Sequence, residues 1–142
     1  MIDQITVFLE NSEGRLAALT RTLADADVSM SALTIADTTD YGVVRIICDK
    51  PETALQALNG AGYRAVATKV SAIQVPNRSG GLADLLETLD SLSLNIEYGY
   101  CFSYKGEYAV DVLKIRGEAQ SAEAAAAIEA AGFKLLAQDD IA

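Results

Sequence analysis

The sequence contains no histidine, and this absence removes several kinds of functional site. Without histidine the chain has no imidazole general base, no Ser-His or Cys-His pair, and none of the commonest zinc ligand. The two cysteines, Cys48 and Cys101, lie far apart and form neither a Cys-x-x-Cys redox motif nor a structural zinc site. We therefore expect no metal, no cofactor, and two reduced thiols that are buried.

Positive charge is scarce, and long apolar runs are missing. The 11 basic residues are outnumbered by 20 acidic ones, so the formal net charge is −9. A surface this acidic repels phosphate backbones, and we expect no nucleic-acid partner. No apolar run approaches the roughly 18 residues of a membrane span. The start, Met1–Gln4, lacks the basic segment of a signal peptide. These features predict a cytoplasmic protein that does not contact a membrane.

Motifs for nucleotide binding and catalysis are also missing. Ser79–Gly81 lacks the Gly-Lys-Ser/Thr ending of a P-loop, and no Gly-x-Gly-x-x-Gly follows a strand-like segment. Carboxylates cluster on or beside segments with helical periodicity, which is typical of a solvated acidic face. These carboxylates are Asp25, Asp27, Asp84, Glu87 and Asp90. We expect no catalytic residues.

The chain contains an internal repeat. Asn11–Ala17 resembles Asn77–Ala83 at an offset of 66 residues (77 minus 11), and seven of twenty positions are identical between residues 11–30 and 77–96. Average residue usage would give only about one or two identities. The same offset places Val44 on Val110 and Ile46 on Val112. We therefore predict two modules, covering residues 1–69 and 70–142.

Each repeat shows the same order of strand-like and helix-like segments. Strands are expected in the first repeat at 5–9, 31–36 and 42–48 and from 63, and in the second at 70–75, 97–104 and 108–115 and from 133. One helix follows each glycine turn. A second begins near Pro51 or near Ser121, an expected N-cap, and ends at Asn59–Gly60 or at Gly132. The order βαββαβ predicts an α+β fold of two ferredoxin-like modules, with antiparallel sheets and helices on one face.

Two segments resemble the start of an ACT domain, a small amino-acid-sensing module. These are Val7–Leu16 and Val75–Leu82, each with the pattern Asn-x-x-Gly-x-Leu between a strand and a helix. The whole chain resembles free-standing tandem ACT-domain proteins. The resemblance implies a free amino acid as effector bound between modules, a homodimer, and a target enzyme of amino-acid metabolism. One departure is that Glu13 and Ser79 stand where many effector-binding turns carry proline.

The two turns are the predicted ligand-binding elements. Glycine lets the backbone approach a ligand closely, and the following helix N-terminus offers N–H groups that suit a carboxylate. The family resemblance adds a polar residue that opens the second strand, eighteen residues after each turn asparagine (95 minus 77 and 29 minus 11). The predicted site residues are Asn11, Gly14, Arg15, Leu16, Ser29, Asn77, Ser79, Gly80, Gly81, Leu82 and Asn95. The alternative is that Asn11 and Asn77 only cap their helices.

An aromatic residue recurs at every second position of the expected strand 97–104 and its approach. The residues are Tyr98, Tyr100, Phe102 and Tyr104. Leu33 and Ile35 are expected to face the helices, and their equivalents 99 and 101 alternate with the aromatics, which therefore lie on the opposite face. This stripe is either a platform for an aromatic ligand or a surface that packs on another sheet or subunit. The same mapping places Arg45 and Asp111 on that face.

Three functions fit these patterns. The first is a non-catalytic regulatory protein that binds an amino acid. The second is a protein–protein interaction module whose ligand sites have decayed. The third is a small hydrolase of the acylphosphatase type, which the ferredoxin-like fold permits, although no arginine-bearing phosphate loop paired with a strand asparagine is present.

Overall fold

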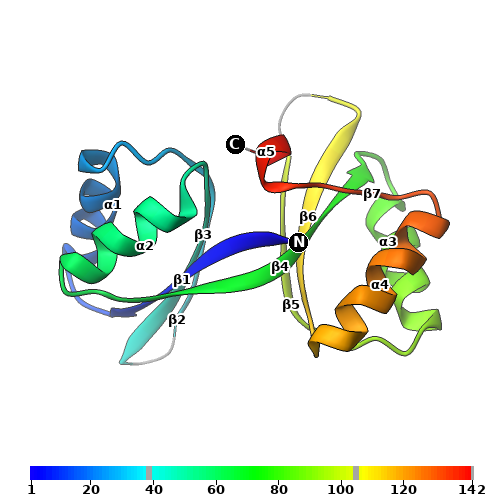
Figure 1. Cartoon of the computed structure of the whole chain (residues 1–142), viewed down its shortest axis with the longest axis horizontal. Coiled ribbons are helices and arrows are strands. Elements are labelled where there is room, and N and C mark those ends of the chain that lie inside the picture. Colours follow the sequence, from blue (N-terminus) through cyan, green and yellow to red (C-terminus); the bar gives the residue numbers. More distant parts are fainter. Residues whose placement is uncertain (38–39, 104–105, 142) are drawn as a thin grey trace. The chain divides into compact units, whose positions relative to one another are not determined.

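The computed structural model describes residues 1–37, 40–103 and 106–141. The chain forms two compact units (Figure 1). The N-terminal unit contains Asp3–Thr68 together with the segment from Gln138 onward, and the C-terminal unit contains Met1–Ile2 together with Lys69–Ala137. The predicted modules 1–69 and 70–142 follow the sequence repeat. The compact units differ from them at the two ends of the chain, since Met1–Ile2 belongs to the C-terminal unit and the segment from Gln138 belongs to the N-terminal unit.

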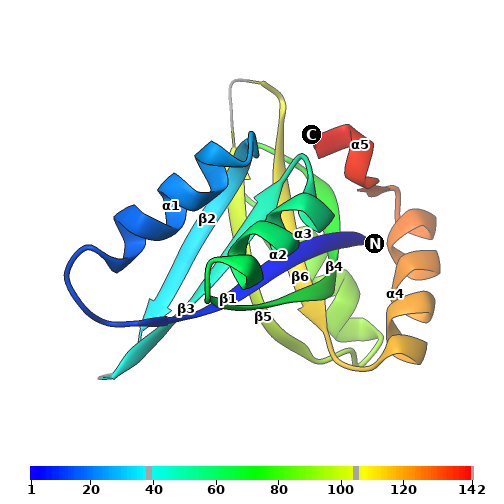
Figure 2. The ribbon, with the colours of Figure 1, turned by 60° about the vertical axis from the view of Figure 1, so that its left-hand side comes forward.

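The N-terminal unit is a sheet with two helices on one face (Figures 1 and 2). Its elements are β1 (Ile2–Glu10), α1 (Arg15–Asp25), β2 (Met30–Asp37), β3 (Tyr41–Cys48), α2 (Pro51–Gly60) and the start of β4 (Arg64–Pro76). The strand order is β2-β3-β1-β4, and β3 runs antiparallel to both β1 and β2. This is the expected ferredoxin-like arrangement.

The C-terminal unit repeats this arrangement. It contains the end of β4, then α3 (Gly81–Ser91), β5 (Ile96–Ser103), β6 (Tyr108–Ile115), α4 (Glu118–Ala130) and β7 (Lys134–Leu135). The strand order is β7-β4-β6-β5, with antiparallel neighbours. The predicted α+β fold of two ferredoxin-like modules is therefore confirmed. The expected last strand of the first module and first strand of the second form one continuous strand, β4.

The two cores follow from the periodicities in the sequence. In β1, alternate apolar residues Ile5 and Val7 face the helices and pack against Leu19 and Leu23, which recur one helical turn apart on α1. The C-terminal unit uses equivalent positions: Ile73, Val75, Leu85 and Leu89. All eight side chains are buried, so both helix layers are fixed to their sheets by apolar contacts.

The third-strand mapping predicted from the repeat is wrong by one residue. Ile35 pairs with Val44, whereas Cys101, its equivalent, pairs with Asp111. The offset is 66 in the second strand (101 minus 35) but 67 in the third (111 minus 44), so the second hairpin contains one additional residue. Because side chains alternate between faces, this shift places Asp111 on the helix-covered face instead of the opposite one. Arg45 does lie on the opposite face, as expected.

The aromatic stripe lies where it was predicted. Tyr98, Tyr100 and Phe102 pair with β6 residues whose side chains point away from the helices, and all three are half-buried. Tyr104 lies outside the described residues. Cys48 is buried as expected, but Cys101 is exposed, which corrects the prediction of two buried thiols.

Helix ends differ in detail from the sequence prediction. Helix α4 begins at Glu118, three residues before the expected cap at Ser121. After α4, Gly132 adopts a left-handed conformation with φ of 93°, and after α2 the same role is taken by Gly62 rather than Gly60. These glycines relieve the strain that a side chain would suffer where each helix stops.

A short C-terminal helix, α5 (Gln138–Ile141), was not predicted and belongs to the N-terminal unit. The Gln138 side chain accepts a hydrogen bond from the Asp3 N–H at 2.9 Å and donates one to the Cys48 carbonyl oxygen at 3.0 Å. The Ser31 hydroxyl donates to the Ile141 carbonyl oxygen at 3.1 Å. These contacts fix the end of the chain to the first strand and the β2–β3 hairpin of this unit.

The turn before α3 is packed too tightly for a side chain at Gly81. A Cβ at this position would collide with the Pro76 carbonyl oxygen. We predict that Gly81→Ala lowers the free energy of unfolding by about 1–3 kcal/mol, measured by urea denaturation. Gly60→Ala is the control, because a Cβ there meets nothing within 4 Å and alanine favours a helix over glycine. Equal stability of the two variants would contradict the prediction.

Candidate functional site

The two strand-to-helix turns share one backbone conformation. Helices α1 and α3 are each preceded by a left-handed glycine, Gly14 with φ of 82° and Gly80 with φ of 86°, and neither helix has a side-chain cap. The turn asparagines instead bond through the backbone to the hairpin beside them. The Asn11 N–H donates to the Asp40 carbonyl oxygen at 3.2 Å, and the Asn77 N–H donates to that of Glu107 at 2.7 Å. The capping interpretation of the asparagines is therefore wrong.

A cavity lies at the same place in both units, between the end of the first strand, the turn and the start of the helix. We call it the turn cavity. In the N-terminal unit its volume is about 170 Å³, and its lining is Leu9, Glu10, Asn11, Ser12, Arg15, Leu16, Ile35, Gly42 and Val44. In the C-terminal unit the volume is about 250 Å³, and the lining is Val75, Pro76, Asn77, Arg78, Leu82, Cys101, Ala109 and Asp111.

All eight lining residues of the second turn cavity have an equivalent among the nine of the first, and Arg15 is the additional residue of the first. With the offset of 66 in the turn and second strand and 67 in the third strand, every residue around the second cavity has its equivalent around the first. Asn77 corresponds to Asn11 and Leu82 to Leu16. Among the predicted site residues, the structure thus brings Asn11, Arg15 and Leu16 around one cavity, and Asn77 and Leu82 around the other.

The remaining turn residues are partly engaged within the turn. The Gly81 N–H, one of the groups at the helix N-terminus expected to meet a ligand carboxylate, already donates to the Arg78 carbonyl oxygen at 3.1 Å. The Arg78 guanidinium donates to the Ser79 carbonyl oxygen and to the Asp84 carboxylate, both at 3.0 Å. These bonds hold the turn closed beside its cavity.

Ser29 and Asn95 lie at the other end of their sheets. The carbonyl oxygen of Ser29 accepts from the Asp49 N–H at 3.1 Å, and that of Asn95 accepts from the Arg116 N–H at 2.9 Å. Both contacts lie beyond the end of the third strand, opposite the turns. Neither unit by itself brings its turn asparagine together with its second-strand polar residue.

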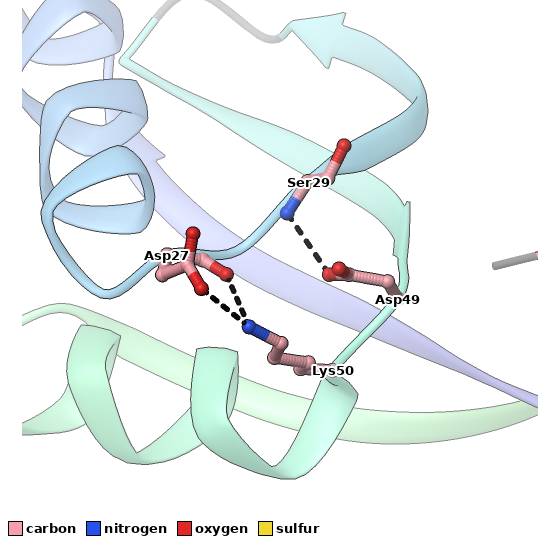
Figure 3. Close-up of polar contacts among 4 residues, drawn as sticks. All are labelled: Asp27, Ser29, Asp49 and Lys50. Carbon is pink, nitrogen blue, oxygen red and sulfur yellow. Dashed lines mark hydrogen bonds and ion pairs between the residues drawn. The ribbon is translucent and has the colours of Figure 1, made fainter.

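Ser29 is part of an exposed polar cluster that closes two loops (Figure 3). The Asp49 carboxylate accepts from the Ser29 N–H at 2.9 Å, and the Lys50 ammonium donates to the Asp27 carboxylate at 2.8 Å and to its carbonyl oxygen at 2.7 Å. The hydrogen bond from Lys50 lowers the pKa of Asp27. Because solvent screens this pair, we assign the cluster a role in loop geometry rather than in chemistry.

Asp111 is the buried titratable group at the C-terminal turn cavity. Only 3% of the residue is exposed, and its Oδ1 accepts a hydrogen bond from the Cys101 thiol at 3.1 Å. Its Oδ2 is buried and has no hydrogen-bond partner among the described residues. Burial raises the pKa of the Asp111 carboxyl. Burial and the hydrogen bond to Asp111 raise the pKa of the Cys101 thiol to about 12.

Sequence reasoning placed Asp111 on the wrong face of the sheet, and so outside the cavity, because the repeat was extended at a constant offset. The identical pair Tyr41 and Tyr108, 67 residues apart (108 minus 41), marks the correct alignment of the third strands. With this alignment Asp111 falls on Val44, while Cys101 falls on Ile35 at the offset of 66 that holds in the second strand. A carboxyl and a thiol thus replace two apolar side chains at the base of the second cavity.

The described residues contain no group of three or more His, Cys, Asp or Glu side chains placed to hold a metal ion. Within the same ranges, no helix is long and apolar enough to cross a membrane.

Comparisons with known proteins bear on the whole chain. A family model described as an ACT domain pair matches residues 1–130. The chain is similar to the crystal structure of a protein from Bacteroides thetaiotaomicron, with 32% identity, a TM-score of 0.91, and coverage of 99% of this chain and 94% of that one. No curated protein matches the sequence.

Two regulatory subunits of aspartate kinase share the fold. The one from Thermus thermophilus has 17% identity and a TM-score of 0.67, and the match covers 92% of each chain. The one from Thermus flavus has 19% identity and a TM-score of 0.62, and the match covers 91% of each chain.

The raised pKa of Asp111 predicts a pH-dependent stability. A carboxyl with a folded-state pKa above its ordinary value of 3.8 contributes stability fully below that value and loses it as the pH rises through the folded-state pKa. We therefore expect Asp111→Asn to be more stable than the wild type by about 1 kcal/mol at pH 7, and by less at pH 4. Urea denaturation at both pH values measures this. The exposed Asp90→Asn is the control, and a pH-independent gain for Asp111→Asn would refute the assignment.

The Cys101 thiol is predicted to react slowly although the residue is exposed. With a pKa of about 12, little thiolate forms at pH 8. We expect alkylation by iodoacetamide at least about ten-fold slower than for an unstructured cysteine. Asp111→Asn should accelerate it, because that change removes the hydrogen-bonded carboxylate. Peptide-resolved mass spectrometry separates Cys101 from Cys48, and a rate unaffected by Asp111→Asn would contradict the coupling.

Proposed function

The chain belongs to the family of ACT domain pairs, and on this premise we propose that it is a regulatory protein that binds a free amino acid and performs no chemistry of its own. The observation that supports this proposal most directly is the pair of equivalent turn cavities. Each cavity is lined by a turn asparagine and by a leucine of the first turn of the helix that follows. This combination suits a small ligand with a carboxylate and an apolar portion.

The proposed mechanism is a shift in population between arrangements of modules. An amino acid would lie in a turn cavity and also contact the polar residue that opens the second strand of a neighbouring module, Asn95 or Ser29. Such a ligand binds only when the two modules are correctly placed, so it favours that arrangement. We propose that a homodimer carries this change to a target enzyme of amino-acid metabolism.

An interaction module without a working ligand site is the second candidate. The observation in its favour is the apolar edge of the N-terminal unit, where Leu33 on β2 is 36% exposed, Ile35 is 44% exposed, and Leu16 on α1 is 37% exposed. Contiguous exposed apolar residues are typical of interaction surfaces. The two candidates differ in whether an amino acid stabilises the native state.

A thermal-shift screen against the twenty amino acids tests the proposal. A ligand that binds only the native state at one hundred times its Kd stabilises that state by about 2.7 kcal/mol. We expect at least one amino acid to raise Tm by several degrees in a saturable manner. If none of the twenty does so, the amino-acid-binding proposal fails and the interaction module is favoured.

Asn77→Ala separates binding from stability. The Asn77 side chain is exposed and lies 3.5 Å from the Gly106 carbonyl oxygen, so its loss should change the free energy of unfolding by less than about 0.5 kcal/mol. We expect amino-acid binding, measured by calorimetry, to weaken by about 1–3 kcal/mol.

The matched control for Asn77→Ala is Asn59→Ala. The Asn59 side chain donates to the Ala65 carbonyl oxygen and accepts from the Ala65 N–H, both at 3.1 Å, and lies outside both cavities. It should lower stability and leave affinity unchanged. If Asn77→Ala lowers Tm but binds the amino acid normally, Asn77 has only a structural role.

A further inference from the structure

The two turn cavities differ in charge at four equivalent positions. Two of them, Glu10 against Pro76 and Ser12 against Arg78, lie in the turn, and Arg78 is already bonded to Asp84. In the third strand, Val44 of the N-terminal unit corresponds to Asp111 of the C-terminal unit. At the start of the helix, Arg15 corresponds to Gly81, where a side chain would collide with the Pro76 carbonyl oxygen. At the start of the helix the first cavity therefore has a cation that the second cannot accommodate, and in the third strand the second has a buried carboxyl where the first has an apolar side chain.

The Asp111 carboxylate leaves a bonding position unused. Its Oδ1 is bonded to Cys101, and its buried Oδ2 has no partner in the part of the chain that the structure describes. A buried carboxylate oxygen without a donor costs free energy, and a ligand N–H offsets that cost. A positively charged nitrogen compensates best, because it also neutralises the buried charge.

The charged and titratable groups around Asp111 are few. Among the lining residues, β5 contributes Cys101, the turn contributes Arg78, and helix α3 contributes only Leu82 and Leu86. The Arg78 guanidinium is already bonded to the Asp84 carboxylate at 3.0 Å. Among the described residues that line this cavity, Asp111 is therefore the carboxylate, and the structure shows no side-chain cation bonded to it.

A second, apolar cavity adjoins the first. Its volume is about 270 Å³, and it shares Leu82, Cys101 and Asp111 with the turn cavity. Its other lining residues are Leu86, Ile96, Gly99, Tyr100 and Leu113. Gly99 keeps it open on the β5 side, because a Cβ there would crowd the Leu113 side chain. Asp111 therefore lies where a polar cavity meets an apolar one.

We propose that the C-terminal module selects an α-amino acid with an apolar side chain, whose ammonium group donates to Asp111 while its side chain enters the adjoining apolar cavity. The ligand carboxylate lies toward Asn77 and the N-terminus of α3. This inference rests on the proposed function and adds the class of ligand and the residue that recognises its amine. The N-terminal module, with Val44 in place of Asp111, does not share this selectivity.

Three related compounds separate the parts of the ligand. Leucine carries the ammonium, the carboxylate and an apolar side chain, 3-methylbutylamine lacks the carboxylate, and 4-methylpentanoate lacks the ammonium. Each is titrated by calorimetry into the full-length wild type, Asp111→Asn, and Asp90→Asn. The last variant removes one negative charge from the exposed side of α3 without touching either cavity. In parallel, the side-chain carboxyl ¹³C resonance of Asp111, assigned by its loss in Asp111→Asn, is followed during each titration.

The expected result is that Asp111→Asn weakens leucine and 3-methylbutylamine at least ten-fold and leaves 4-methylpentanoate unchanged. Asp90→Asn should bind all three as the wild type does, and the Asp111 resonance should shift with the two amines only. If leucine binds the wild type and Asp111→Asn equally, the inference is overturned and the proposed function stands. If leucine does not bind while 3-methylbutylamine shifts the Asp111 resonance, the cation site stands and the amino-acid function for this module falls.

Discussion

The packing of two helices on one face of each sheet makes strand register the constraint on which the chemistry of this protein depends. Once the helices cover a face, a shift of one residue in a strand exchanges every buried side chain for an exposed one. The apolar alternation of β1 and β4 fixes the two cores. The third strand of the C-terminal unit then places Asp111 beneath α3, where a carboxyl is costly. A fold stabilised only for packing would place a residue like Val44 there.

Duplication explains how such a residue is tolerated. Each unit has its own apolar core, so a polar substitution at one cavity leaves the other core intact. The Cys101 thiol partly satisfies Asp111, whose pKa is raised by burial, and desolvation together with this hydrogen bond raises the pKa of the Cys101 thiol. The cost of burying Asp111 therefore arises in the C-terminal unit, whose core is separate from that of the N-terminal unit.

Much of the fold could be predicted from the sequence, because the repeat and the two periodicities are local signals. The predicted strand Tyr108–Ile115 agrees with β6, and the helix predicted to begin near Pro51 agrees with α2. The merging of two expected strands into β4 and the docking of α5 could not be predicted, since they depend on contacts between distant parts of the chain. The face of Asp111 was missed for another reason. In β3 and β6, apolar residues occur on both faces of the strand. An offset of 66 therefore aligns valines with valines as convincingly as the correct offset of 67 aligns the core residues of the two strands.

Each turn cavity also contains one charged side chain whose hydrogen bonding is incomplete, Arg15 in the N-terminal unit and Asp111 in the C-terminal unit. The absence of an arginine at the second cavity follows from backbone packing. In the N-terminal unit the turn leaves room for Arg15, whose guanidinium lies 5.2 Å from the centre of the Tyr63 ring and whose buried Nε lacks a hydrogen-bond partner among the described residues. In the C-terminal unit the turn closes on the Pro76 carbonyl oxygen, so only Gly81 fits. The N-terminal cavity thus has an incompletely bonded cation at the start of its helix, whereas the C-terminal cavity has an incompletely bonded carboxyl in its third strand. Since both cavities sit at the start of a helix on the same scaffold, the proposed function implies that the two modules of one chain distinguish two ligands while using one mode of conformational coupling.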